Sequence, residues 1–514
     1  MIEVKAKSHH SDDDPAESKK NLKKYIEDVG YQYMVLSEAF PEYAIQCSLF
    51  MPDKAKRTSI DGLAGWFAIQ EDPDPQDKEV EELPAQHRPR FVKPNVIFKY
   101  EHDTDKEQYI DQLANGGILE YLDVTKEVIA MQPTIKSRTE IFLRILNEGI
   151  TPADYSISKN CKSCEFNTGE VRPNGFEECW EDMASKNPHI FDLYFGGAIG
   201  HYKSGWYLDE LISSNKASLY DVDLERLKNS KGETGSRAVR QMLQIQKTRS
   251  NEEWISPDLT AEISRFQYPL HFVDFETYTG ALPFYQGMRP YELIAFQWSC
   301  HTIQEKGTTP VHREWIHTCS DFPNFEFTKS LMECIGDDGT PLMWATHENT
   351  VLRTILNQMA VFGYDDVALE SWLTRITTDK DAGREGRFID MNKLAQQYYF
   401  HPFMKGRTSI KKVLPAVWNF NEYLYEVPHF KGYVVKDLEN GIMDPYDTLT
   451  AGIAVTEDDE VVKGGTAAMR AYQRIRYDES LTAPHKNELR QQLLRYCKLD
   501  TMAMVIIAYH WGLR

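Results

Sequence analysis

Three segments that are far apart in the chain carry acidic side chains whose spacing suits a shared metal site. Asp274 and Glu276 alternate in the apolar stretch HFVDFET, so both carboxylates should lie on one face of a strand. Glu348 follows a short apolar stretch and opens an expected helix, while Tyr496 and Asp500 are four residues apart and should share one helix face. Apolar elements that bury several carboxylates need cations to offset the cost of removing those charges from water.

Oxygen ligands of this kind favour hard divalent ions such as Mg²⁺ or Mn²⁺, and a pair of these ions about 4 Å apart can drive phosphodiester hydrolysis. Each segment also has a purely structural interpretation when it is taken alone. Asp274 and Glu276 could be solvated acids near a strand end, and Glu348 could simply complement a helix dipole. Asp500 could be one hydrogen-bonded acid on an amphipathic helix.

Taken in order, these residues resemble the signature of the DEDD superfamily, the DnaQ-like exonucleases that are built on an RNase H-like sheet. In that family, D-x-E lies on the first strand, a further acid follows the middle strand, and the last acid lies four or five residues after Tyr or His on a late helix. Residues 268–514 also resemble an uncharacterised bacterial family, a domain of unknown function placed among these nucleases. The strings that carry this likeness are HFVDFET, ELIAFQWSCH, FIDMNKLAQQYYFHPFMKGRTSIKKVLPA, GGTAAMRAY and YCKLDTMAM.

The resemblance implies a 3′→5′ exonuclease that hydrolyses terminal phosphodiesters of DNA or RNA, with single-stranded ends as the expected substrate. It assigns Tyr496 to orienting the attacking water, and it assigns two Mg²⁺ or Mn²⁺ ions to four ligands, Asp274, Glu276, Glu348 and Asp500. A tyrosine phenol, with a pKa near 10, is a poor base, so the ions would account for most of the deprotonation. Glu348 departs from the Asp typical of the superfamily and would act as a longer ligand.

Two further groups of candidate residues lie between the second and third acidic segments. Asp390, in the strand-like FIDM, is a candidate acid behind the metal ligands, with a purely structural role as its alternative. The basic segment KGRTSIKK could hold the substrate backbone, or it could be a solvated loop and helix start. Its cations are Lys405, Arg407, Lys411 and Lys412.

The amino-terminal part carries a second nuclease-like motif, Glu3-x-Lys5 in the expected strand IEVKA. Together with the following helix, it resembles the PD-(D/E)XK nucleases of RecB-like and CRISPR-associated type, in which the Glu binds metal and the Lys supports the nucleophile. The helix residues concerned are Asp28, Gln32 and Tyr33. Alone, E-x-K could equally mark a surface strand. The family's upstream Asp and first Cys should precede this motif, so we expect a truncated module without nuclease activity of its own.

Three of the eight cysteines cluster in the chain, at Cys161, Cys164 and Cys179. The RecB-like resemblance implies that they bind a 4Fe–4S cluster or Zn²⁺, with the fourth ligand missing from this sequence. The alternative is three free thiols in a loop. The other five should be reduced or buried thiols; Cys47 could substitute for the missing ligand, although a core position is the simpler interpretation.

The whole chain has 514 residues and a formal net charge of −20. This length predicts several domains, which we place at 1–190 for the RecB-like module, 191–265 for a helical linker module and 266–514 for the exonuclease domain. An acidic chain is a poor candidate for wrapping DNA broadly, so nucleic-acid contacts should come from local basic strips such as Arg226–Arg249. No apolar run is long enough for a transmembrane helix and MIEVKAKSHH lacks a signal-peptide core, so we expect a cytoplasmic protein without membrane contact.

These acids require an α/β fold that brings a strand, a helix start and a late helix together. Strands are expected in PLHFVDFET, YELIAFQWSCHTI, VHREWIHT and PLMWATHE, with helices in FEFTKSLMECI, TVLRTILNQMAVF and the closing stretch from 487. This order favours an RNase H-like mixed sheet covered by helices. In the amino-terminal part we expect helices at 22–40 and 137–149 and an exposed loop at 70–95.

Two other functions remain open for this sequence. One is a nucleic-acid-binding or assembly protein in which both nuclease folds have decayed, and Mn²⁺ binding at the acids would argue against it. The other is an endonuclease that acts through the amino-terminal module. Activity that survives Asp274→Ala but is lost in Lys5→Ala would indicate that second function.

Overall fold

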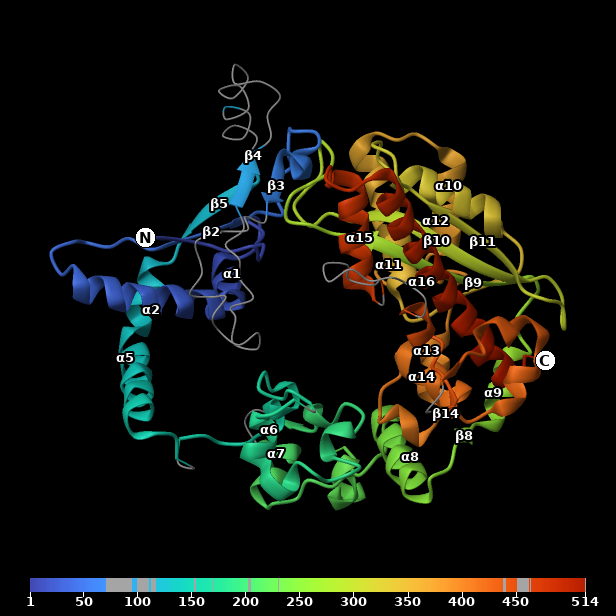
Figure 1. Ribbon diagram of the computed structural model, residues 1–514, viewed down its shortest axis with the longest axis horizontal. Helices are drawn as coiled ribbons and strands as arrows, with labels where there is room; N and C mark the ends of the chain where they lie inside the picture. The colour runs from blue at the N-terminus through green and yellow to red at the C-terminus, as the bar shows by residue number, and fades with distance from the viewer. Residues whose placement is uncertain are drawn as a thin grey trace.

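The computed structural model describes a mixed α/β protein organised around two separate sheets (Figure 1). The described residues are 1–70, 95–98, 111, 117–151, 154–169, 171–201, 205–229, 231–437, 441–450, 462 and 464–513. The predicted α/β class is confirmed, whereas most of the predicted exposed loop at 70–95 lies outside these residues. None of the described helices is long and apolar enough to cross a membrane.

The carboxyl-terminal half contains a five-stranded sheet in the order β11-β10-β9-β12-β13. Its central strand, β9, pairs antiparallel with β10 and parallel with β12. At the edges, β11 pairs antiparallel with β10, and β13 pairs parallel with β12. The strands confirm the predicted segments, with bounds β9 (Leu270–Tyr278), β10 (Ile294–Ile303), β11 (Val311–Ile316), β12 (Thr340–Met343) and β13 (Ile389–Asp390).

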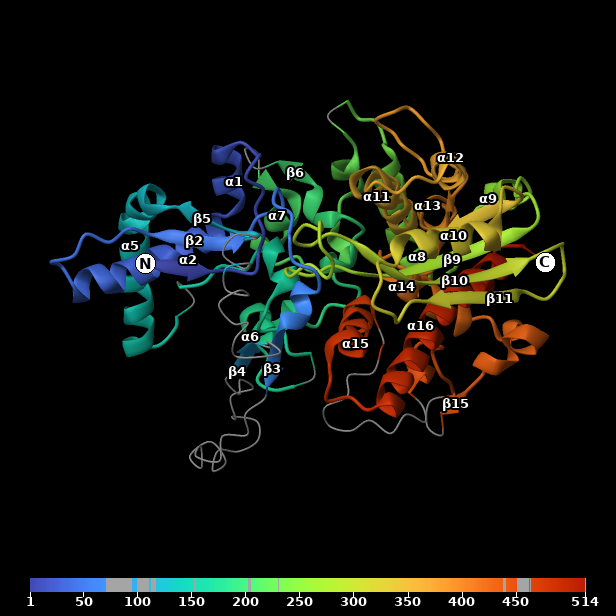
Figure 2. The ribbon, with the colours of Figure 1, turned by 90° about the horizontal axis from the view of Figure 1, so that it is seen from above.

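Helices cover both faces of this sheet, which explains why every residue of β10 is buried (Figure 2). On one face, Val273 and Phe275 of β9 belong to a core cluster with α10, α11 and α12, whereas Phe272 belongs to the cluster that includes α14 and α16. Because side chains alternate along a strand, Asp274 and Glu276 lie on the face of α16. The helices are α10 (Asn324–Ile335), α11 (His347–Phe362), α12 (Val367–Ile376), α13 (Met391–Tyr398), α14 (Ile410–Trp418), α15 (Gly465–Tyr477) and α16 (Ala483–His510).

The amino-terminal sheet is smaller, with β1 parallel to β2 and β2 antiparallel to β5. Two helices, α2 and α5, share its core. The helix predicted at 22–40 is confirmed, but the one predicted at 137–149 already begins at Thr125, because Pro133 lies within α5 without ending it. The bounds are β1 (Ile2–Val4), α1 (Pro15–Asn21), α2 (Lys23–Ala39), β2 (Ser48–Pro52), β3 (Phe67–Gln70), β4 (Asn95–Phe98), β5 (Leu119–Asp123) and α5 (Thr125–Glu148).

The middle of the chain forms a helical part with its own core around Trp180 and Leu208. Arg240 of α8 joins it to the carboxyl-terminal half, because its guanidinium donates a hydrogen bond to the carbonyl of Tyr399. The remaining helices are α6 (Gly175–Trp180), α7 (Tyr207–Ser213), α8 (Ser236–Ser250) and α9 (Pro257–Ile263). The remaining strands are β6 (Gly200–His201), β7 (Gly205–Trp206), β8 (Trp254–Ile255), β14 (Tyr399–Phe400), β15 (Lys436–Asp437) and β16 (Gly441–Ile442).

Candidate metal centre

The two acids of the D-x-E motif lie on β9 and face α16. One carboxylate oxygen of Asp274, one of Glu276 and the sulfur of Cys497 all lie within 4.8 Å of one another. The Cys497 thiol, on α16, donates a hydrogen bond of 3.3 Å to Oδ2 of Asp274. The structure therefore confirms that the two acids share a face, and it adds a buried thiol that the spacing of the acids did not indicate.

Glu348 lies in the first turn of α11, as predicted, and only 2% of its surface is exposed. The chain reaches this helix through Ala345, whose φ is +72°. Asp390 stabilises that turn, because its Oδ1 accepts a hydrogen bond of 3.1 Å from the Ala345 amide while it also caps the start of α13. Asp390 thus positions the residues that lead to Glu348. The Oε2 atom of Glu348 is buried and has no hydrogen-bond partner among the described residues.

Two tyrosines lie beside Asp500. The Tyr446 hydroxyl donates a hydrogen bond to Oδ1 of Asp500, and the Tyr496 phenol, one helical turn earlier, is near enough to lower the pKa of this carboxyl. The ammonium of Lys411 lies 4.9 Å from the centre of the Tyr496 ring and 5.4 Å from that of Tyr446. The predicted pairing of Tyr496 with Asp500 is confirmed. Tyr446 is 54 residues away from Asp500, so no local spacing in the sequence could have identified it.

Burial and mutual repulsion raise the pKa values of the carboxyl groups at this site. Burial raises the pKa of Glu348 to about 8 and, against the hydrogen bond from Tyr446, that of Asp500 to about 6. The pKa values of Asp274 and Glu276 lie well above the usual range, because repulsion from the other acids adds to the effect of burial. Lys411 offsets part of this charge, since it lowers the pKa values of Glu276 and Asp500.

This arrangement fits divalent cations. Its donors are carboxylate oxygens held on β9, α11 and α16, and the buried Oε2 of Glu348 lacks a partner among the described residues. Oxygen donors favour Mg²⁺ or Mn²⁺, and such an ion would stabilise the ionised form of acids whose pKa values burial has raised. Burial and the neighbouring acids also raise the pKa of Cys497, so it acts as a protonated hydrogen-bond donor instead of a thiolate ligand.

Tyr496 keeps its proton at this site. Burial, followed by the charges of Asp500 and Glu276, raises the pKa of its phenol above the ordinary value. A phenol of this kind donates hydrogen bonds and does not act as a base near neutral pH. Its position beside Asp500 therefore suits the orienting role that the family resemblance implies.

The four cations of the basic segment 405–412 do not gather at one place. Lys411 acts on the acids of the site, whereas the charge of Lys412 acts on Asp444 and opposes the rise in pKa that burial causes there. Arg407 faces the middle part of the chain, where burial and the charge of Arg407 lower the pKa of Lys162. Lys405 has a φ of +47° at the end of a 3₁₀ turn. Of this predicted substrate-binding segment, the structure brings Lys411 to the acids.

The basic run Arg226–Arg249 makes several internal contacts. Arg226 donates two hydrogen bonds to Glu210, at 3.0 and 2.7 Å. Lys247 forms a salt bridge of 2.7 Å with Glu252. Arg240 is only 4% exposed and binds a backbone carbonyl of the carboxyl-terminal half. These three cations stabilise the middle part of the protein, so a substrate-binding role for this run stays a prediction that rests on its other cations.

The residues of the amino-terminal motif contact one another. The Lys5 ammonium lies 2.8 Å from Oε1 of Glu3 and also donates to Asp28, while Gln32 donates a hydrogen bond of 2.9 Å to Oε2 of Glu3. Tyr33 packs against the core of this module. The hydrogen bonds lower the pKa of Glu3 and raise that of Lys5, so each group stabilises the charge of the other.

The three clustered cysteines lie near one another on short helical turns. Burial and the neighbouring Cys161 and Cys164 raise the pKa of Cys179. The sulfur of Cys161 accepts a hydrogen bond of 3.4 Å from the Ser158 amide. Among the described residues, these sulfurs do not form a group whose ligand atoms all lie within 4.8 Å. All eight cysteines are free and Cys47 is buried, as expected, and the metal cluster stays a prediction.

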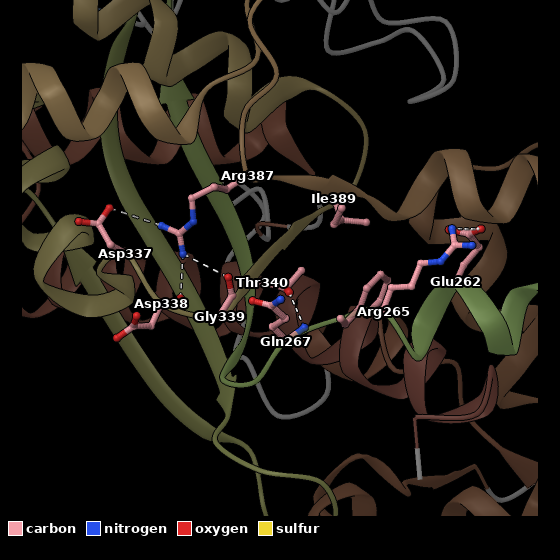
Figure 3. A pocket seen from close by; sticks show the side chains of 10 residues that line it. Glu262, Arg265, Gln267, Asp337, Asp338, Gly339, Thr340, Arg387 and Ile389 are labelled. Carbon is pink, nitrogen blue, oxygen red and sulfur yellow. Dashed lines mark hydrogen bonds and ion pairs between the residues drawn. The ribbon is translucent and has the colours of Figure 1, made fainter.

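A surface cavity of about 410 Å³ lies at the other end of the sheet, where β9 and β12 begin (Figure 3). Its lining includes Thr340 and Arg387. The Arg387 guanidinium donates hydrogen bonds of 2.8 Å to the carbonyls of Gly336 and Asp338, so its donors are used within the protein. This cavity contains none of the candidate acids, and we assign it no role.

Comparison with known proteins identifies one similar family. Residues 271–409 match a family described as a domain of unknown function, DUF2779. This range lies within the stretch that resembles an uncharacterised bacterial family, and it includes Asp274, Glu276 and Glu348 but not Asp500. No curated protein and no solved structure shows a significant match to the chain.

Proposed function

We propose that this protein is a metal-dependent nuclease whose carboxyl-terminal half is a DnaQ-like 3′→5′ exonuclease with an RNase H-like sheet. The observation that carries the proposal is the gathering of four acids in one buried region: carboxylate oxygens of Asp274 and Glu276 lie within 4.8 Å of each other, and the charges of Asp500 and Glu348 act on Asp274. They come from the central strand, from the helix after a neighbouring strand and from the last helix. These are the three places at which the DEDD resemblance expects its acids.

The acids and their neighbours have different proposed roles. Asp274, Glu276, Glu348 and Asp500 would hold Mg²⁺ or Mn²⁺. When bound, these ions activate water and neutralise charge on the phosphate. The Tyr496 phenol keeps its proton and would donate a hydrogen bond that orients the attacking water. Lys411 places a positive charge beside the acids, where it would attract the phosphate of a terminal nucleotide.

A degradation assay tests this proposal directly. Short DNA and RNA single strands, labelled at either the 5′ or the 3′ end, are incubated with Mn²⁺ and the protein. We expect the wild type to shorten 5′-labelled strands stepwise from the 3′ end and to release 5′-nucleotides, and Asp274→Ala to abolish this activity. Asp365→Ala, which changes an exposed acid between α11 and α12, is the matched control and should cleave like the wild type. Equal cleavage by Asp274→Ala would refute the proposal.

The amino-terminal motif supports a second candidate, nuclease chemistry in the first module. The observation that favours it is the contact of Lys5 with Glu3 and of Glu3 with Gln32. Cleavage that survives Asp274→Ala and is lost in Lys5→Ala would support this candidate. The same contacts serve equally well as an ion pair at the edge of a sheet, so we rank this candidate second.

A further inference from the structure

A second group of metal-ligating side chains lies in the amino-terminal module and includes none of the residues discussed above. One ring nitrogen of His9 and one carboxylate oxygen from each of Asp53 and Glu120 all lie within 4.8 Å of one another. Asp53 is fully buried and His9 is 9% exposed. An imidazole with two carboxylates is a donor set that suits Zn²⁺ better than Mg²⁺ or Ca²⁺.

The backbone of the small sheet holds these three residues in place. The segments that contain His9 and Asp53 share two backbone hydrogen bonds, of 3.0 and 2.9 Å. The Asp53 amide, directly after β2, donates a hydrogen bond of 2.8 Å to the carbonyl of Ile118. Glu120 lies on β5 opposite Met51 of β2. The group therefore joins three neighbouring chain segments that backbone hydrogen bonds and strand pairing hold together.

Two buried polar atoms of this group have no hydrogen-bond partner within the part of the chain that the structure describes. The amides of Ser11 and Ala55 donate to Oδ1 of Asp53 at 3.0 and 2.9 Å, but its Oδ2 accepts no hydrogen bond from the described residues. The same holds for Nε2 of His9. A buried polar atom without a partner loses its hydrogen bonds to water and gains none in return. A cation that accepted electron pairs from these ligands would offset this loss.

Lys56 now provides a positive charge at the edge of the group. Its ammonium lies 2.9 Å from Glu120 and 4.0 Å from Oδ2 of Asp53. The second distance is too long for a hydrogen bond. The Lys56 side chain is 37% exposed, so it can swing into solvent when another cation binds. Lys56 would therefore compete with a metal ion for the two carboxylates.

We propose that His9, Asp53 and Glu120 form a Zn²⁺ site that fastens the three segments of the small sheet. Three protein ligands leave one position of a tetrahedral ion for water. The Irving–Williams order implies that Mn²⁺ binds more weakly at the same ligands. This site does not depend on the proposed exonuclease function, because it shares no residue with the carboxylate centre or with the Glu3–Lys5 motif.

Counting zinc in variants of the full chain tests the site. The metal-free protein is dialysed against low Zn²⁺, and bound zinc per chain is measured by atomic emission. We expect His9→Ala and Glu120→Gln each to bind one ion fewer than the wild type, while His10→Ala, the matched control, binds the same number. Zinc held at other places contributes equally to all four proteins and cancels. Equal zinc contents in all four proteins would overturn the proposal.

Lys56→Met provides a second test that does not require removal of a buried ligand. Without the competing ammonium, the Zn²⁺ affinity at this site should rise roughly tenfold, and Zn²⁺ should raise the melting temperature more than in the wild type. If the cluster serves only as an ion pair, Lys56→Met loses the pair and gains no Zn²⁺ affinity. An unchanged affinity in this variant would overturn the proposal, even if His9→Ala fails to fold.

Discussion

Two charged motifs on strands of this protein behave in opposite ways. Burial and the neighbouring acids raise the pKa values of Asp274 and Glu276 on β9, whereas hydrogen bonds lower the pKa of Glu3 and raise that of Lys5 on β1. The difference lies in the elements around them. Helices cover both faces of the sheet around β9, whereas β1 is an edge strand whose residues alternate between exposed and half-buried.

This contrast shows that a short charged motif acquires its chemistry from the burial of its strand. At the edge of the small sheet, opposite charges can meet near water and stabilise each other. In the centre of the large sheet, acids gather with little compensation and a cation gains most by binding there. The first arrangement is complete as an ion pair, and the second is the one at which we propose that metal binds.

Asp500→Asn should reduce exonuclease activity and stabilise the metal-free protein at the same time. We expect the cleavage rate to fall by a factor of about 10³ or more, because a metal ligand is lost. The folded pKa of about 6 lies above the ordinary value of 3.8, so Asp500 contributes stability below about pH 4 that is lost as pH rises past 6. At pH 8, without metal, the variant should unfold at a higher temperature, by roughly 2–4 °C for each kcal/mol gained. A lower melting temperature would contradict this.

Mn²⁺ affinity should rise steeply with pH. The pKa of Glu348 is raised to about 8 and that of Asp500 to about 6, so at pH 6 these carboxyls hold protons that metal binding must displace. Each displaced proton changes the affinity up to tenfold for each pH unit, and we expect up to about a hundredfold tighter binding at pH 8 than at pH 6. Calorimetric titrations in buffers of different ionisation enthalpy would count the released protons. Affinity independent of pH would show that the acids bind no ion.

Tyr496→Phe should slow cleavage by about 10–100-fold while Mn²⁺ affinity stays the same, because the phenol orients water and does not bind the ion. Tyr446→Phe is the comparison, since its hydroxyl also donates to Asp500. We expect a smaller loss of rate in this variant and a slightly higher pKa for Asp500. Single-turnover rates with saturating Mn²⁺ separate the two effects. Equal losses of cleavage rate in both variants would indicate that Tyr496 does no more than Tyr446, and has no separate part in orienting water.

Lys411→Met should weaken substrate binding roughly tenfold at low salt. It should also reduce the slope of the logarithm of the Michaelis constant against the logarithm of the salt concentration, by about the amount that one phosphate contact contributes. Lys412→Met, its neighbour, is the matched control and should have little effect. The two side chains point about 100° apart on α14, and Lys411 is the one that acts on the acids. Equal effects from both variants would indicate a general attraction by the basic segment.

Lys5→Met should have the smallest effect, with no change in exonuclease rate and about 0.2–1 kcal/mol lost from the unfolding free energy, as for partly exposed ion pairs. Chemical denaturation of the full chain would measure this loss through its first transition. A large loss of cleavage in Lys5→Met would indicate that the main activity belongs to the amino-terminal module.

The sequence predicts the elements of the large sheet well, because their apolar patterns are long and regular. The positions of Asp274, Glu276, Glu348, Tyr496 and Asp500 follow from the alternation of a strand and the turn of a helix. Other parts of the site depend on contacts between distant segments. Tyr446 and Cys497 reach the acids only after folding, and the capping role of Asp390 depends on the turn at Ala345.

Two local patterns gave an incomplete picture. The helix expected at 137–149 begins earlier, at Thr125, and continues through Pro133, because its packing against α2 stabilises the helix. The basic segment 405–412 reads as one patch, but α14 begins at Ile410, so the turn before it and the helix after it direct its cations to different neighbours. In both cases tertiary packing outweighed the local sequence.

Exonuclease activity at the acids of the large sheet is tested most directly by cleavage of a 5′-labelled single strand under single-turnover conditions with Mn²⁺. The wild type, Asp274→Asn and Lys5→Met are compared. We expect stepwise shortening from the 3′ end by the wild type and by Lys5→Met at equal rates, and none by Asp274→Asn. The opposite pattern, in which Asp274→Asn cleaves normally and Lys5→Met does not, would contradict this expectation.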